Sequence, residues 1–150
     1  MAGLYFEEFE VGHIFRHELR RSITEADNML FSNMTLNPQP LHIDFEFCKN
    51  TEFGRPLVNS LFTLGLMIGI SVNDTTIGTT VANLGMTDVR FPHPLFHGDT
   101  VHVETEVRDV RPSRSRPTQG IVTFVHRAYN QNDTLVSVCE RTALMHKRPT

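Results

Sequence analysis

The stretch Leu57–Val72 is apolar on almost every face of the helix that it predicts. A helix with one apolar stripe lies at a surface, whereas a helix that is hydrophobic all round is enclosed by other parts of the protein. Polar residues interrupt the stretch, and it falls below the ~20 apolar residues that span a bilayer. We therefore expect a core helix, not a membrane anchor, and the rest of the chain must enclose it.

Four downstream segments have the β-branched and aromatic composition of strands. They are Thr79–Phe91, Val101–Arg111, Gly120–Tyr129 and Thr134–His146. From Val101 to Arg108, apolar or threonine side chains alternate with charged or histidine side chains, which is typical of a half-buried antiparallel strand. The run Asn130–Asp133 predicts a hairpin turn between the last two segments. The predicted fold class is α+β, with an antiparallel sheet wrapped around a long central helix.

Two shorter elements are predicted upstream of the central helix. Phe15–Ile23 has the composition of a strand. Thr24 followed by Asp27 has the spacing of a capping box with Asp in place of Glu, and it opens a helix that ends near Ser32. These elements complete one folded unit.

Length and composition limit the number of domains and the partners. The chain has 150 residues, 39% of them hydrophobic and 21% charged, which predicts a single domain over residues 1–150. A net charge of −3 gives no general reason to bind nucleic acid or an anionic membrane. Without a signal-peptide pattern, Cys48 and Cys139 are expected to be reduced thiols of a cytoplasmic protein.

A polar turn stiffened by two prolines precedes the apolar stretch: Asn37-Pro38-Gln39-Pro40-Leu41-His42-Ile43-Asp44. Each proline restricts its own φ and the conformation of the residue before it. Asn37, Gln39 and His42 are therefore expected to stand on a rigid scaffold. Polar side chains held rigidly beside a buried helix suggest an active site.

With this turn, the helix enclosed by a sheet and the segment Phe96–Val101, the chain resembles the MaoC-like hydratase branch of the hotdog fold, over about Tyr5 to Lys147. The family motif aligns without gaps on the proline-containing turn, which implies that His42 is the catalytic histidine. Asn37 then stands where the family has its catalytic aspartate. A second register puts Asn37 and Pro38 on the motif's Asn-Pro, but it needs a two-residue insertion.

The resemblance implies an enoyl-CoA hydratase/dehydratase, a lyase that adds water reversibly across the double bond of an acyl thioester. It needs no cofactor beyond the coenzyme A of its substrate, and no metal. His42 transfers protons, because an amide such as Asn37 cannot act as a base, while Asn37 and Gln39 hold the attacking water. The enolate oxygen is met by the Ser60 N–H at the helix start, next to Asn59.

The substrate class implied by the resemblance is a short, branched dicarboxylic acyl-CoA such as mesaconyl- or itaconyl-CoA, with medium-chain enoyl-CoA as the competing class. Arg55 and Arg90 are the candidate cations for a distal carboxylate, and surface ion pairing is the alternative for both. Arg114 and Arg116 are candidates for the CoA phosphates or simply a solvated turn. Asp44 either contributes to the site or caps a helix.

Two other function classes stay open. The first is a non-catalytic acyl-CoA-binding or regulatory hotdog protein, because Asn37 replaces a carboxylate. The second is a hotdog thioesterase, which is disfavoured because Leu57–Val72 contains no Asp or Glu. Hotdog subunits pair through their sheets, so a homodimer or a dimer-based oligomer is expected. The spacing of His93, His97 and His102 does not predict a metal site.

Overall fold

The computed structural model describes residues 3–150. In chain order the elements are η1 (Phe6–Glu8), β1 (Ile14–Arg16), β2 (Arg21–Ser22), α1 (Glu25–Met34), α2 (Pro40–Ile43), α3 (Phe45–Cys48), α4 (Ser60–Thr75), β3 (Thr80–Arg90), β4 (Thr100–Pro112), β5 (Gln119–Tyr129) and β6 (Leu135–His146).

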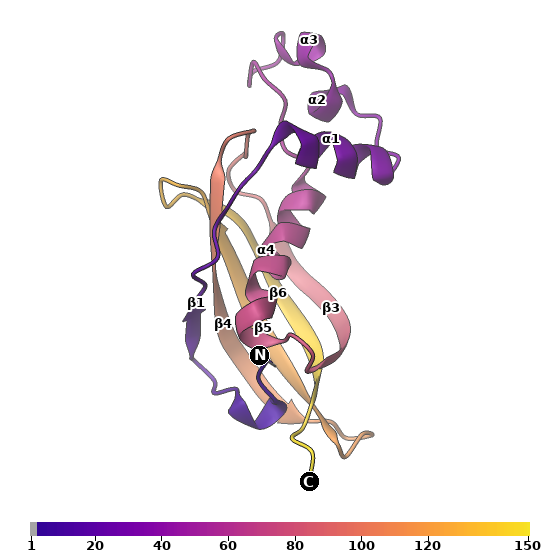
Figure 1. The fold of residues 1–150 in the computed structure, drawn as a ribbon, viewed down its shortest axis with the longest axis vertical. Coiled ribbons are helices and arrows are strands. Elements are labelled where there is room, and N and C mark those ends of the chain that lie inside the picture. Colours follow the sequence, from indigo (N-terminus) through magenta and orange to yellow (C-terminus); the bar gives the residue numbers. More distant parts are fainter. Residues whose placement is uncertain (1–2) are drawn as a thin grey trace.

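The sheet is antiparallel and curls around α4 (Figure 1). Its strand order is β1-β4-β5-β6-β3, and β2 also pairs with β4. The α+β prediction, with the sheet around a central helix, is therefore confirmed. The predicted hairpin turn is present as well, with Asp133 in the left-handed region at a φ of 59°.

The predicted strand Phe15–Ile23 is divided in two. Arg16 pairs with Glu104 and Arg21 pairs with Val101, so the upstream chain has more residues between these pairs than β4 does. The extra residues cannot join the ladder, and the strand breaks into β1 and β2. His17 lies in this break and turns inward, where its side chain is buried.

The central helix begins later than Leu57 because the chain first forms a β-bridge between Leu57 and Phe96. Asn59 is the N-cap of α4, and its side-chain oxygen accepts the Leu61 N–H. One side of α4 packs against the sheet with Met67 and Ile70, which are 0% and 2% exposed. The expectation that the helix is enclosed on all sides is wrong for the side that carries Leu61, Gly65 and Gly69, all of which are exposed.

A chain of buried polar groups connects α4 to the sheet. Arg141 Nε donates to His126 Nε2 at 3.0 Å, and Thr105 Oγ1 lies 2.8 Å from the other ring nitrogen of His126. Thr105 Oγ1 also lies 2.8 Å from His17 Nε2, and His17 Nδ1 lies 2.8 Å from an Asp74 carboxylate oxygen. These bonds hold the C-terminal end of α4 against β4, β5 and β6.

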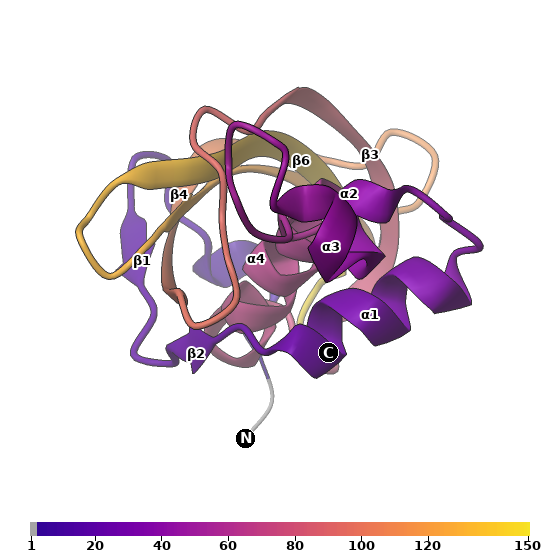
Figure 2. The same cartoon turned by 90° about the horizontal axis from the view of Figure 1, so that it is seen from above.

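Helices α1, α2 and α3 form a cap over the N-terminal end of α4, as the view along the long axis shows (Figure 2). The predicted capping box of α1 is present, because Thr24 Oγ1 accepts the Asp27 N–H and the Asp27 carboxylate accepts the Thr24 N–H. The proline-containing turn is more regular than predicted, since Pro40 opens the short helix α2. The cap carries His42 to the start of the central helix.

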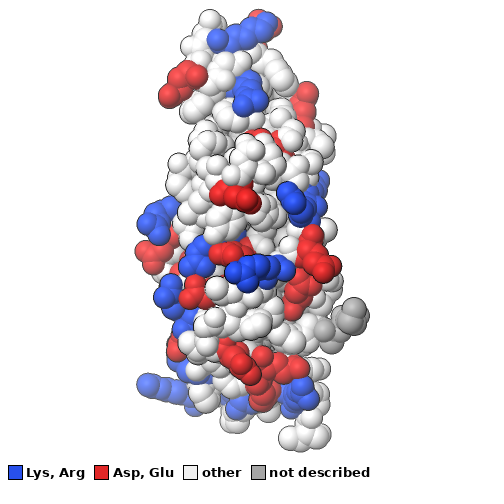
Figure 3. All heavy atoms as spheres, turned by 90° about the vertical axis from the view of Figure 1, so that its left-hand side faces the viewer, with Lys and Arg blue, Asp and Glu red and all other residues white. Residues whose placement is uncertain are grey.

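Acidic and basic side chains are interspersed on the face that bears β1 and β4 (Figure 3). Within the sheet, Arg127 of β5 pairs with Glu106 at 2.9 Å and approaches Glu104 at 3.7 Å. That face therefore has no single-signed patch of the kind that binds nucleic acid. Among residues 3–150, no helix is both long and apolar enough to cross a membrane.

Candidate functional site

His42 is held by one ring nitrogen. Its Nδ1 lies 2.7 Å from the Leu57 carbonyl oxygen. Because a carbonyl only accepts hydrogen bonds, Nδ1 carries the proton, and in the neutral ring Nε2 has a free lone pair. The half-buried imidazole is thus oriented by the backbone just before α4, with Nε2 as its proton acceptor.

Ser60 provides a free backbone donor at the start of α4. The N–H groups on either side are taken, since the Asn59 N–H donates to Asn28 Oδ1 and the Leu61 N–H donates to Asn59 Oδ1. Among residues 3–150, no group accepts the Ser60 N–H. A free N–H at the positive end of a long helix is suited to an oxygen that gains negative charge.

A cavity of about 230 Å³ lies beside this donor. Ser60 and Leu57, the residue whose carbonyl holds His42, both line it. The rest of the lining is mainly apolar: Phe53, Val58, Thr63, Phe91, His93, Pro94, Leu95 and Val136. His42 does not line this cavity; it is connected to it through the carbonyl of Leu57, which orients the imidazole.

Asn28 is a residue of the site that the sequence interpretation missed. It is 0% exposed, and its amide nitrogen lies 3.1 Å from the His42 carbonyl oxygen and 3.0 Å from the Leu57 carbonyl oxygen. The available signal was that Asn28 and Ser32 are polar residues one turn apart on the inner face of α1, where apolar residues are expected.

The side chain of Asn37 forms a hydrogen bond within its own turn. Its Oδ1 accepts the Gln39 N–H at 3.1 Å, while the Gln39 side chain is exposed. Asn37 lines a separate cavity of about 270 Å³ together with Leu36 and Ile43. No hydrogen bond among residues 3–150 joins the Asn37 side chain to His42. Its role as the holder of the attacking water stays a prediction.

Asp44 and Asn59 both serve as helix caps. The Asp44 carboxylate accepts the Phe47 N–H at 2.9 Å, and Asp44 is the N-cap of α3. Asn59 is 3% exposed, caps α4, and donates through its amide to Ser32 Oγ at 3.3 Å. Asn59 thus fixes the helix start from which the Ser60 N–H projects. Asp44 caps a helix, which was the alternative to a role in the site.

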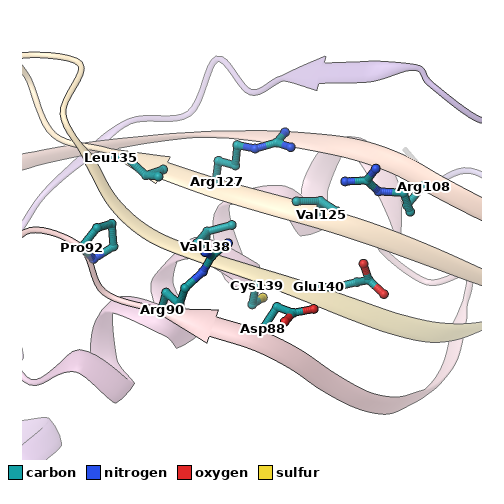
Figure 4. A pocket seen from close by; sticks show the side chains of 10 residues that line it. All are labelled: Asp88, Arg90, Pro92, Arg108, Val125, Arg127, Leu135, Val138, Cys139 and Glu140. Atoms are coloured by element: carbon teal, nitrogen blue, oxygen red, sulfur yellow. The ribbon is translucent and has the colours of Figure 1, made fainter.

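The two arginines proposed for a distal carboxylate lie in different places. The guanidinium of Arg55 stacks over the Phe96 ring at 3.8 Å, and its charge is felt by His97, a neighbour of Asn28. Arg90 instead lines a cavity of about 320 Å³ on the sheet, and Arg108 and Arg127 belong to the same lining (Figure 4). Arg55 is thus close to His97, whereas Arg90 lies on the sheet.

Arg114 and Arg116 lie in the hairpin between β4 and β5, at the opposite end of the molecule from α2 (Figure 1). Within one chain they are separated from His42 by the length of α4, which at 1.5 Å per residue is about 24 Å for 16 residues. The structure therefore does not bring them together with the rest of the candidate site.

Both cysteines are free and buried. Burial raises the pKa of the Cys139 thiol to about 11, so this group stays protonated at neutral pH. Among residues 3–150, no three His, Cys, Asp or Glu side chains are clustered as a metal site requires.

Comparison with known proteins agrees with this architecture. The family described as "MaoC like domain" matches residues 8–130. Mesaconyl-CoA hydratase of Cereibacter sphaeroides is 28% identical over 149 residues, which are 99% of this chain but 43% of that protein. The chain thus spans less than half the length of this curated relative.

Two solved structures are similar over nearly all of the chain. The monoamine oxidase regulatory protein of Archaeoglobus fulgidus is 31% identical with a TM-score of 0.87, over 99% of this chain and 98% of that one. Rv0216 of Mycobacterium tuberculosis, described as a double hotdog fold, is 24% identical with a TM-score of 0.87, over 98% of this chain and 45% of that one. The hotdog prediction is confirmed, and the chain belongs to the family of MaoC-like domains.

Proposed function

We propose that the chain is an enoyl-CoA hydratase/dehydratase, which adds water reversibly across the double bond of an acyl thioester. One observation carries the proposal: Ser60, whose backbone N–H is free, lines an apolar cavity together with Leu57, and the Leu57 carbonyl orients the His42 imidazole through Nδ1. Hydration needs one group that moves protons and one donor for the enolate oxygen, and these two groups are of the required kinds.

In the proposed reaction the thioester oxygen accepts the Ser60 N–H. Water attacks the β-carbon, its oxygen forms the new C–O bond, and its proton passes to His42 Nε2. The π electrons move onto the α-carbon and the thioester oxygen, where the helix start stabilises the enolate. His42 then returns the proton to the α-carbon and becomes neutral again. Asn37 is proposed to hold the water through the oxygen lone pair that Gln39 leaves free.

The proposed substrate is a short acyl-CoA, because the cavity beside Ser60 has a volume of only about 230 Å³. The similarity to mesaconyl-CoA hydratase favours a branched dicarboxylic acyl group such as mesaconyl- or itaconyl-CoA. His93 lines the cavity and Arg55 lies near His97, so these two residues replace Arg90 as candidate partners of a distal carboxylate. A medium-chain enoyl group would have to extend beyond the cavity.

A homodimer is part of the proposal. Strand β3 is at the edge of the sheet, with Leu84 52% exposed and Val89 39% exposed. The exposed side of α4 carries Leu61 at 58%. Pairing of β3 with a second copy would cover a sheet edge that otherwise invites aggregation, and it would supply the second hotdog unit that a double hotdog chain contains.

We propose a cytoplasmic location, in line with two free thiols.

A non-catalytic acyl-CoA-binding or regulatory protein is the second candidate. Two observations favour it: Asn37 stands in the position of a carboxylate, and the similar Archaeoglobus fulgidus protein is described as regulatory. A thioesterase is less well supported. The only carboxylate on α4 is Asp74, which lies at the far end of the helix and is bonded to His17.

The proposal is tested by mixing the purified protein with crotonyl-, mesaconyl-, itaconyl- and octenoyl-CoA. We expect enoyl-thioester absorbance to fall for at least one of the three short substrates, faster than for octenoyl-CoA, with no release of free thiol. Thiol release would establish a thioesterase instead. Saturable binding of these thioesters without either signal would support the binding protein and contradict the hydratase.

A further inference from the structure

We infer that Asn28 is a positioning residue that sets His42 and the Ser60 N–H in place together, with His97 as its acceptor. The inference rests on the proposed function only where it predicts how a change of Asn28 affects turnover. Asn28 lies on α1 and is 0% exposed. Its one side-chain amide contacts α2, the segment before α4, the N-cap of α4 and the loop between β3 and β4.

The orientation of the amide is determined by its partners. The Asn59 N–H can only donate, and it lies 2.9 Å from Asn28 Oδ1. The amide nitrogen therefore faces the other partners, the carbonyl oxygens of His42 and Leu57 and the Nε2 of His97, at 3.1, 3.0 and 3.0 Å. Rotating the amide by half a turn would place its oxygen against two carbonyls and its hydrogens against an N–H.

These bonds act on both reacting groups. The Leu57 carbonyl accepts from Asn28 and from His42 Nδ1, so Asn28 anchors the acceptor that orients the imidazole. Asn28 also binds the carbonyl of His42 itself. On its other side, Asn28 takes the N–H of Asn59, the residue immediately before Ser60. The amide thus links the backbone positions that set the separation of His42 Nε2 and the Ser60 N–H.

His97 completes the arrangement only when it is neutral. The amide nitrogen of Asn28 can only donate, so His97 Nε2 must offer a lone pair to bond with it. Its two hydrogens face three acceptors, the two carbonyl oxygens and His97 Nε2, so one hydrogen is shared between two of them. Burial lowers the pKa of His97 and favours this form; Glu25 and Asp27 act in the opposite direction, and Arg55 acts in the same direction as burial. The Phe45 ring packs edge-on against the imidazole at 6.1 Å. On protonation, His97 would present an N–H to the amide N–H of Asn28, and the hydrogen bond between the two side chains would be lost.

The test is Asn28→Asp in the full chain. The carboxylate has nearly the same shape and still accepts the Asn59 N–H, but it loses both donors and places charge against two carbonyls. We expect kcat for the best short enoyl-CoA to fall about 10- to 100-fold while KM changes much less, because misplacement of reacting groups acts on the transition state. Asn50→Asp makes the same change on an exposed residue in the turn after α3 and is expected to retain wild-type kcat.

A second readout does not depend on turnover. The His42 Nδ1–H is bonded to Leu57 in the wild type, so its exchange with water, measured by NMR on ¹⁵N-labelled protein, should be slow. We expect exchange about tenfold faster in Asn28→Asp, and a smaller increase in His97→Leu, which keeps the amide. If the wild-type protein has no hydratase activity, this measurement alone tests whether Asn28 positions His42. Wild-type exchange and wild-type kcat in a folded Asn28→Asp or His97→Leu protein would overturn the inference.

Discussion

Replacing His42 with alanine is expected to lower kcat for enoyl-CoA hydration by about 10²- to 10⁴-fold, the usual contribution of a positioned acid–base group. Nδ1 of the imidazole is hydrogen-bonded to the Leu57 carbonyl oxygen at 2.7 Å. The other ring nitrogen, Nε2, is therefore the atom that can take the proton from water and return it. Initial rates with the best short enoyl-CoA provide the measurement.

His42→Asn separates proton transfer from structure. An asparagine amide can still donate to the Leu57 carbonyl from near the position of Nδ1, but it cannot carry a proton between water and carbon. It should be as inactive as His42→Ala while unfolding at the wild-type temperature. His13→Ala, at an exposed histidine before β1, should keep full activity. Near-wild-type turnover in His42→Asn would remove His42 from the chemistry.

Replacing Ser60 with proline is expected to lower kcat by about 10²- to 10³-fold, the effect of losing one donor to an oxyanion. Proline has no N–H, so this change deletes the proposed donor itself. The first position of a helix accepts proline well. Asn59, the residue before it, has φ −57° and ψ 122°, and this ψ is allowed before proline. The helix should therefore form as in the wild type.

Ser60→Ala is the matched control, because it removes the exposed hydroxyl and keeps the backbone N–H. It is expected to retain kcat within about twofold, since an exposed side chain contributes little. Urea unfolding of Ser60→Pro should give stability equal to or above that of wild type, as proline restricts the unfolded chain. An active Ser60→Pro protein of normal stability would show that the enolate is stabilised elsewhere.

The helix and strands were predictable because their signals are local. Hydrophobic periodicity places α4 and β3 to β6 to within a few residues. The start of α4 differs because Leu57 bonds to a residue far along the chain, Phe96, before the helix begins. The exposed side of α4 was missed for another reason: apolar composition alone does not show which sides of a helix the rest of its chain covers.

The site was predictable only where a motif identified it. His42 and the Ser60 N–H follow from the resemblance to MaoC-like hydratases; in the structure Ser60 lines a cavity with Leu57, and the Leu57 carbonyl binds His42. Asn28 was not predicted because its partners, three backbone groups and the side chain of His97, are distant from it in the sequence. Arg90 and Arg55 are both near predicted element ends, but strand register directs Arg90 into a cavity away from Ser60.

His42 is expected to work although Asn37 replaces a carboxylate, and the variant Asn37→Asp decides whether it does. Aspartate keeps the acceptor that Asn37 Oδ1 offers to the Gln39 N–H and adds a group that can take a proton from water. The measurement is kcat for hydration of the best short enoyl-CoA by wild type and by Asn37→Asp, side by side. We predict that both are active, with the variant about 10- to 100-fold faster. Wild-type turnover at the buffer background beside an active Asn37→Asp protein would contradict this expectation and identify the natural chain as a binding protein.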